Sequence, residues 1–171
     1  MNQGKEYYCY FVEGDDDKKV VNTLKTELQG IIPGKVHKFN VIENRLNMGH
    51  LRTLRSGTII ILVFDTDTGK TSILEENIKF LKNQKIVKEV YCITQVMNLE
   101  DELVRSCSID AIKELTKSKS NTDFKRDILR ISNLKDRLEA CGFECAKFWN
   151  SKPQNEYKHI SNDSDKVKKQ K

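Results

Sequence analysis

Two short stretches of the chain combine a run of apolar residues with an abrupt change to acidic residues and glycine. One runs from Phe11 to Asp17 (Phe-Val-Glu-Gly-Asp-Asp-Asp), and the other from Val63 to Gly69 (Val-Phe-Asp-Thr-Asp-Thr-Gly). This pattern is expected where a buried strand ends and its loop presents carboxylates at one edge of a sheet. Two such strand ends lying side by side would form a metal site.

The residue types suit a hard divalent cation such as magnesium. This ion prefers oxygen ligands in a near-octahedral set and keeps several waters, so one or two carboxylates usually suffice on the protein side. Alternate residues of an extended chain point the same way, so Asp65 and Asp67 can both face one ion while Thr66 faces elsewhere. Gly69 lets the backbone turn away. An isolated Asp-x-Asp is a weak signal, and the distant Glu13-Gly14 pair makes it more specific.

Apolar periodicity predicts the elements that carry these loops. Strands are predicted over 7–12, 36–42, 58–64 and 89–96, with helices around 20–28, 47–54 and 73–81. The alternation of strands and helices is typical of a parallel sheet covered on both faces. We expect an α/β, Rossmann-like fold with four mostly parallel strands, followed by a C-terminal helical extension. Ligands of such sheets bind beyond the carboxyl ends of the strands, where both acidic loops would lie.

Length and composition indicate one domain of ordinary size. The chain has 171 residues, of which 37% are hydrophobic and 32% charged. We expect a single domain over 1–149, with its core at about 6–96 and the helical extension at 97–149. No apolar run approaches the length of a membrane span and the first residues are polar, so we expect a cytoplasmic chain without a membrane partner. Five scattered cysteines without a Cys-x-x-Cys pair disfavour a zinc site.

The positive charge is uneven along the chain. Residues 150–171 carry six lysines and three acidic residues, and we expect a flexible basic tail there; a nucleic-acid-binding tail is the alternative. In the helical extension, Lys117, Lys119, Lys125 and Arg126 could meet a phosphate backbone, although such mixed faces are usually solvated. Trp149 is expected to pack onto the body of the protein rather than to stack on a base.

These motifs resemble those of a known family. The Phe11–Asp17 strand end resembles the hydrophobic-Glu-Gly-x-x-Asp opening of the TOPRIM (topoisomerase-primase) domain, and Phe64–Gly69 resembles its Asp-x-Asp motif, with one predicted strand between them. The resemblance covers roughly residues 6–96. It implies a compact Rossmann-like domain whose acids hold magnesium or manganese. Domains of this family serve phosphodiester chemistry in topoisomerases, primases, small RNA-maturation nucleases and OLD-type nucleases.

The resemblance also implies roles for individual residues. Glu13 matches the motif glutamate, which is a general acid/base or a metal ligand, and Asp65 and Asp67 match the metal-binding pair. Asp17 matches an acid that resembles an additional metal ligand in the nuclease branch. The catalytic set would therefore be Glu13, Asp65 and Asp67, and the metal would be Mg²⁺ or Mn²⁺.

A further acidic cluster, Glu100-Asp101-Glu102, follows the fourth predicted strand. Leu99 and Leu103 face one way at helical spacing, which puts the acids on the other side. The cluster resembles the acidic helix near the metal site of OLD-type proteins, and this resemblance makes Glu100 a candidate fifth ligand. The alternative is a helix start with carboxylates that favour its positive end.

The expected function is that of a divalent-metal-dependent nuclease acting on DNA or RNA, in prokaryotic or phage defence or in nucleic-acid processing. A metal-bound water can attack the phosphate, Glu13 can transfer a proton, and Lys70 is the nearest lysine in sequence. The chain lacks the tyrosine-bearing domain of a topoisomerase and the zinc module of a bacterial primase, which indicates a small stand-alone member of the family.

Two other functions fit the same acids. The first is a non-catalytic module that binds metal and nucleic acid, or a subunit of a larger complex. The second is a phosphatase similar to the haloacid dehalogenases, with Asp65 as nucleophile and Asp67 as acid, which would leave Glu13-Gly14 unexplained. The expected partner is nucleic acid, together with a protein partner or a second copy of the chain.

Overall fold

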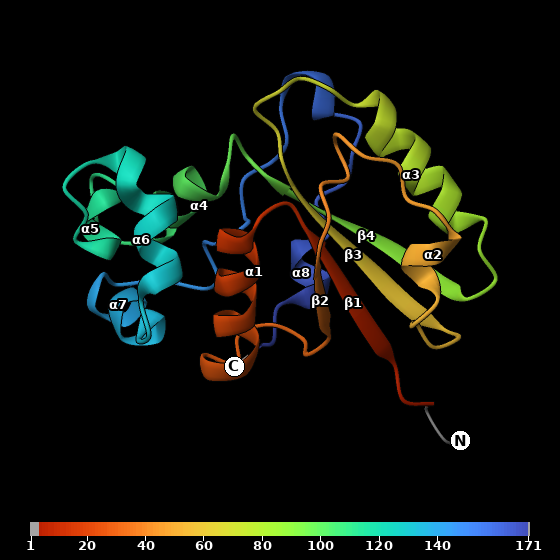
Figure 1. Ribbon diagram of the computed structural model, residues 1–171, viewed down its shortest axis with the longest axis horizontal. Coiled ribbons are helices and arrows are strands. Elements are labelled where there is room, and N and C mark those ends of the chain that lie inside the picture. The colour runs from red at the N-terminus through yellow and green to blue at the C-terminus, as the bar shows by residue number, and fades with distance from the viewer. Residues whose placement is uncertain (1–3, 171) are drawn as a thin grey trace.

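Four parallel strands form the centre of the protein, in the order β2, β1, β3, β4 across the sheet (Figure 1). This computed structural model describes residues 4–170. The sheet predicted as mostly parallel is wholly parallel, and helices on both faces make the fold α/β and Rossmann-like. The strands are β1 (Tyr7–Val12), β2 (Lys35–Lys38), β3 (Thr58–Asp65) and β4 (Val87–Gln95).

Strand β3 is the most completely buried strand. It lies between β1 and β4, and every residue from Thr58 to Phe64 is buried. Its β-branched and aromatic side chains favour the extended conformation, and a strand covered on both faces needs a continuous apolar run. Asp65 is therefore the first residue at which this strand leaves the core.

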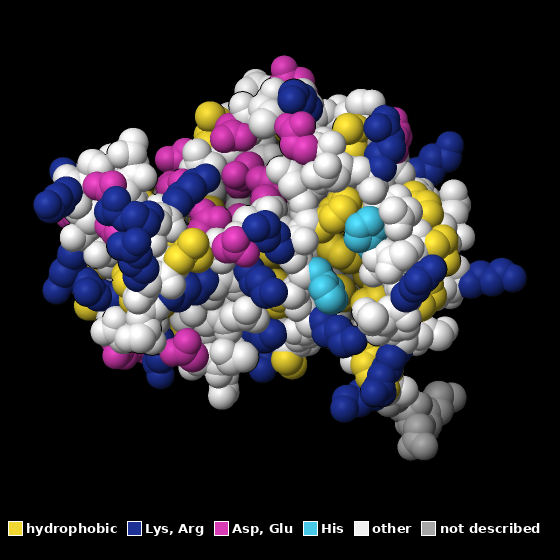
Figure 2. Space-filling view, viewed as in Figure 1, with side chains coloured by type: hydrophobic (Ala, Val, Ile, Leu, Met, Phe, Trp, Pro, Cys, Tyr) yellow, Lys and Arg dark blue, Asp and Glu magenta, His cyan; other side chains and the backbone are white. Residues whose placement is uncertain are grey.

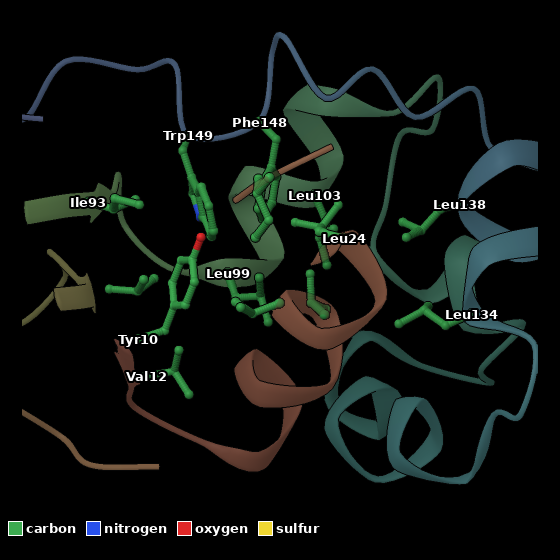
Figure 3. Packing of buried hydrophobic residues seen from close by; sticks show 14 of the residues in the cluster. Tyr10, Val12, Leu24, Ile93, Leu99, Leu103, Leu134, Leu138, Phe148 and Trp149 are labelled. Atoms are coloured by element: carbon green, nitrogen blue, oxygen red, sulfur yellow. The ribbon is translucent and has the colours of Figure 1, made fainter. Parts of the chain in front are cut away.

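Different helices cover the two faces of the sheet, α1 (Asp15–Asn22) on one and α2 (Met48–Leu51) with α3 (Ser72–Lys82) on the other. Successive side chains of a strand point to opposite faces. Tyr10 and Ile93 therefore pack toward α1 and the C-terminal helices (Figure 3). Phe11 and Phe64 pack on the other face, in a cluster with residues of α2 and α3.

The chain after β4 forms a group of short helices beside α1, seen at the left of Figure 1. Phe124, Ile128 and Leu138 from this group are fully buried in the same apolar cluster as Tyr10, so the helices and the sheet share a core. None of the helices in the described chain combines the length and the apolar character that a membrane span requires. The four main helices are α4 (Leu99–Ser106), α5 (Lys113–Thr116), α6 (Phe124–Arg130) and α7 (Leu134–Ala140).

Strand β2 is shorter than the predicted strand over 36–42. The side chain of Asn40 accepts hydrogen bonds from the backbone N–H groups of Ile42 (2.9 Å) and Glu43 (3.1 Å). Asparagine commonly bonds to the backbone in this way and starts a turn. The strand therefore ends before Asn40, and Val41 and Ile42 enter the core from a loop.

The expectation of a flexible tail over 150–171 is wrong for the residues that the structure describes. The segment contains a 3-10 turn at Asn155–Tyr157 and helix α8 (Ser164–Val167), and Tyr157 and Val167 are buried. Asp163 pairs with the outer strand β4 through its backbone N–H and its side chain, at 2.7 and 2.9 Å from Cys92. The sequence did not predict this packing, because few apolar residues lie between the lysines. Lys171 lies outside the described residues.

Val167→Asp tests the packing of this segment. A charge at a fully buried position without a partner should lower the free energy of unfolding by about 3 kcal/mol or more. Gln170→Asp adds the same charge at an exposed position and serves as the control. Urea denaturation of both variants measures the effect. Equal stability of the two variants would mean that the segment does not pack as described.

Candidate metal centre

Strands β1 and β3 lie side by side, and the chain leaves them toward opposite faces of the sheet. Helix α1, after β1, covers one face, and α3, after β3, covers the other. In parallel sheets a crevice forms beyond the carboxyl ends of two neighbouring strands whose connections diverge in this way. Glu13 follows β1 and Asp65 ends β3, so both residues lie at this place.

The carboxyl groups of Glu13 and Asp65 are hydrogen-bonded to each other. Burial raises the pKa of Glu13, and the negative charges of Asp17 and Asp67 raise it further. Burial also raises the pKa of Asp65, as does the charge of Glu13. The pair therefore holds a proton at neutral pH.

Asp17 is a third buried acid at the same place, with 5% of its surface exposed. Its Oδ1 accepts a hydrogen bond from Nε2 of Gln95 at 2.9 Å, and its Oδ2 accepts one from the backbone N–H of Gly14 at 3.1 Å. Burial raises the pKa of Asp17 to about 7, and the charges of Asp16 and Asp65 add to this effect. The structure thus brings Asp17 into the site, with each carboxylate oxygen already bonded to the protein.

Gly14 gives the acids the space that they occupy. A Cβ at this position would lie 2.6 Å from Oδ1 of Asp16 and 3.3 Å from Oδ2 of Asp17. A side chain here would therefore push the carboxylates away. Gly14 also precedes the first residue of α1, and its N–H donates to Asp17 three residues later, which is one half of a capping box.

Gln95 joins Asp17 to Asp65 and was not predicted as a site residue. Its Nε2 donates to Oδ1 of Asp65 at 2.7 Å as well as to Asp17. Gln95 is the last residue of β4 and pairs in register with Asp65. A glutamine at a strand end carries no motif of its own. The only signal in the sequence was the alignment of two predicted strands, which would place Gln95 beside Asp65.

Asp67 lies in the loop after β3, which Thr66 ties to the neighbouring strand. Oγ1 of Thr66 donates to the carbonyl of Gln95 at 3.1 Å and accepts from the N–H of Met97 at 3.0 Å. Thr66 thus bonds to the chain at the end of β4. The charge of Asp67 raises the pKa of both members of the Glu13–Asp65 pair, so Asp67 lies within electrostatic reach of them.

Tyr157, from the C-terminal segment, holds the rest of this loop. Its hydroxyl lies 3.1 Å from Oγ1 of Thr68 and donates to the carbonyl of Lys70 at 2.8 Å. The amino group of Lys70 forms an ion pair with Glu43 at 3.2 Å. Lys70 is therefore engaged away from the acids, although it is the nearest lysine to Asp67 in the sequence.

Glu100 does not join the pair. Its carboxylate forms an ion pair with Lys125 of α6 at 3.7 Å. Burial lowers the pKa of Lys125, but the charges of Glu100, Asp16 and Asp65 raise it more, so the net shift is upward. The positive charge of Lys125 thus interacts with Glu100 and with the central acids.

Glu102 lies on the inner side of α4, contrary to the expectation drawn from Leu99 and Leu103. It is fully buried, and its carboxylate accepts hydrogen bonds from the backbone N–H groups of Val96 (2.9 Å) and Trp149 (3.0 Å). Residues three apart lie on the same side of a helix, so Glu102 shares the buried side with Leu99. Its role is to hold the end of β4 and the Trp149 backbone together.

The uncompensated charge of these acids fits a hard divalent cation. Within residues 4–170, no lysine or arginine forms an ion pair with Glu13, Asp17, Asp65 or Asp67. No group of three acidic, histidine or cysteine side chains in that part of the chain is arranged to hold a metal ion. One or two carboxylates with several waters satisfy magnesium or manganese, so Glu13 and Asp65 would suffice if a cation replaced the proton that they share.

The fold and the site together define a Rossmann-like α/β protein that gathers buried acids where two parallel strands end. No protein-family model, curated protein or solved structure matches the chain. Its function is therefore inferred from the positions and charges of these side chains.

Asp65→Asn should stabilise the metal-free protein above neutral pH. Because the carboxyl pKa values are raised by folding, to about 7 for Glu13 and Asp17 and about 9 for Asp65, the folded state binds more protons than the unfolded state between about pH 4 and pH 9. The free energy of unfolding therefore falls as the pH rises through this range. Removing the ionisable carboxyl group of Asp65 should raise the free energy of unfolding on the order of 1–3 kcal/mol at pH 8 and change it little at pH 4.

Urea denaturation in EDTA at both pH values measures this effect. Asp127→Asn is the control, because Asp127 is only partly buried and its hydrogen bond with Arg126 lowers its pKa. That variant should not gain stability at either pH. Destabilisation of Asp65→Asn at pH 8 would contradict the electrostatic account.

Proposed function

We propose that the chain is a small TOPRIM-type nuclease that uses Mg²⁺ or Mn²⁺ to cleave phosphodiester bonds of DNA or RNA, in defence or in nucleic-acid processing. The observation that carries this proposal is the contact between the carboxyl groups of Glu13 and Asp65 at the ends of β1 and β3. The matching motifs, Glu13-Gly14 after the first strand and Asp65-Thr66-Asp67 after the third, lie at this place in the fold.

The acids would have different roles in the reaction. Glu13 and Asp65 would hold the cation, and Asp67 would join them from its loop. A cation held there would supply a water of lowered pKa and would neutralise charge on the attacked phosphate. Glu13 takes the proton of the attacking water as the new P–O bond forms. The leaving oxygen would take its proton from water as the old P–O bond breaks.

Basic side chains around the acids favour a polyanionic substrate. Figure 2 shows acidic side chains gathered over the carboxyl ends of the strands, with lysine and arginine beside them over α6. Within the predicted basic cluster, Lys125 interacts electrostatically with the central acids. Arg126 bonds instead to Asp123 (3.1 Å) and Asp127 (2.9 Å). A phosphate between Lys125 and the cation would meet positive charge on both sides.

A non-catalytic metal- and nucleic-acid-binding module is the second candidate. The observation that favours it is that, within residues 4–170, no three ligating side chains are arranged for a metal. The phosphatase gains less support. Its nucleophile would be Asp65, whose carboxyl is bonded to both Glu13 and Gln95.

Cleavage of a substrate panel tests the nuclease. The purified chain should cut at least one of plasmid DNA, single-stranded DNA and structured RNA in Mg²⁺ or Mn²⁺, and not in EDTA. Glu13→Gln should lower the rate by about a hundredfold to ten-thousandfold, because it cannot transfer the proton. Asp65→Ala should abolish cleavage, and Asp127→Asn should leave it unchanged.

Other outcomes of this panel separate the alternatives. Metal and nucleic-acid binding without scission of any substrate would establish the binding module. Release of phosphate from small esters without strand scission would establish the phosphatase. Cleavage that persists in EDTA, or that Glu13→Gln leaves intact, would overturn the proposed mechanism.

Lys125→Gln should weaken nucleic-acid binding equally for all sequences. Removing one phosphate contact should reduce the slope of log affinity against log salt by about 1. Lys85→Gln is the control, because Lys85 is exposed in the loop before β4 at the opposite edge of the sheet. Fluorescence anisotropy over a salt series, with Ca²⁺ in place of Mg²⁺ to prevent cleavage, measures both slopes. Equal slopes for the two variants would remove Lys125 from the binding surface.

A further inference from the structure

A single buried amide connects two of the acids of the centre. Gln95 is 1% exposed, and its Nε2 donates to Oδ1 of Asp17 (2.9 Å) and to Oδ1 of Asp65 (2.7 Å). A side-chain amide has two N–H donors, and here each goes to a different carboxyl group. The separation of these two carboxyl groups is therefore tied to one planar group.

Trp149 determines which end of this amide faces the acids. Its indole N–H donates to Oε1 of Gln95 at 3.0 Å. The indole nitrogen is only a donor, so it can bond to the amide oxygen and not to the amide NH₂. If the amide were turned over, its oxygen would face Asp17 and Asp65 and its NH₂ would face the indole N–H. The contact with Trp149 excludes that arrangement.

Hydrogen bonds to its backbone and packing of its ring hold Trp149 in place. Its backbone N–H donates to Glu102 at 3.0 Å, and its carbonyl accepts from Asn162 (2.7 Å) and Ser164 (2.9 Å). Its ring is fully buried against Phe148, with ring centroids 4.6 Å apart. Figure 3 shows the Trp149 side chain within the packed apolar cluster between the sheet and α4. As predicted, this tryptophan packs onto the body of the protein.

A second buried amide shows what an ordinary structural role looks like. Asn77 is also 1% exposed and has the same number of hydrogen bonds as Gln95, with two donated and one accepted. All its partners are backbone groups of the loop over 41–46. The partners of the Gln95 side-chain amide are all side chains, and both of its donors go to candidate metal-site acids.

We propose that Gln95 and Trp149 are positioning residues of the metal centre, in which the indole N–H orients the amide and the amide sets the separation of Asp17 and Asp65. This inference rests on the proposed function, because it concerns the same site. It assigns a role in the centre to the C-terminal part of the chain, which supplies Trp149. Because Trp149 is the only tryptophan in the chain, its indole N–H also reports on the centre.

The affinity for Mn²⁺, measured by electron paramagnetic resonance of the free ion, tests this role. Gln95→Met keeps a side chain of similar length but removes the amide, and Trp149→Phe keeps a buried ring but removes the N–H. Each should weaken Mn²⁺ binding by about tenfold to a hundredfold, as is usual for groups that orient metal ligands. Asn77→Leu is the matched control, since it removes an equally buried amide. It should lower stability without changing Mn²⁺ affinity.

A spectroscopic measurement separates positioning from general destabilisation. In the wild-type protein labelled with ¹⁵N-tryptophan, Mg²⁺ should shift the single indole N–H resonance. The shift should persist in Asn77→Leu and disappear in Gln95→Met. If Gln95→Met does not fold, the Mn²⁺ affinity of Trp149→Phe decides the question alone.

The outcomes distinguish this inference from the proposed function. Tight Mn²⁺ binding by the wild type, with equal affinity in the Gln95, Trp149 and Asn77 variants, would overturn the positioning role and leave the nuclease standing. Absence of Mn²⁺ binding by the folded wild type would overturn the metal centre and the positioning role together. Metal binding and positioning without cleavage of any substrate would leave this inference intact and overturn the nuclease.

Discussion

The structure depends on one electrostatic constraint, the withdrawal of three carboxyl groups from water where two parallel strands end. For Asp17 alone, a pKa of about 7 instead of 3.8 corresponds to an unfavourable term on the order of 3–5 kcal/mol at neutral pH. Such a term is a large part of the stability of an ordinary domain. The surrounding fold must offset it, and strand β3, which is apolar from Ile59 to Phe64 and packed on both faces, is the element best placed to do so.

The centre is built by both ends of the chain. The acids come from the first half, after β1 and β3, but the groups that orient them come later in the sequence. Trp149 orients the amide of Gln95, and Tyr157 holds the loop that follows Asp67. A Rossmann-like core carrying the same acids without these contacts would leave the carboxyl groups free to separate under their own repulsion. The C-terminal segment therefore belongs to the site as well as to the core.

The sequence predicted the parts of this structure that local patterns determine. Continuous apolar runs located β1, β3 and β4, and the alternation with helices required a parallel sheet with both acidic ends at one edge. Contacts that depend on register or on a distant partner carried no local signal. Gln95 acquires its role only through its pairing with Asp65, and Glu102 through its bonds to Val96 and Trp149. The packing of 150–170 was missed because few apolar residues lie among its lysines.

The pair of Glu13 and Asp65 can be neutralised in two ways, by a proton or by a cation, and the choice sets what the site can bind. With a proton shared between them, the site still presents an acidic surface that repels a phosphate group. In the proposed reaction a divalent cation would reverse this potential, and a phosphate would then lie between the cation and Lys125. Because Lys125 is already paired with Glu100 at 3.7 Å, it does not neutralise the central acids itself. In the proposed reaction, cation binding must therefore precede or accompany the binding of nucleic acid.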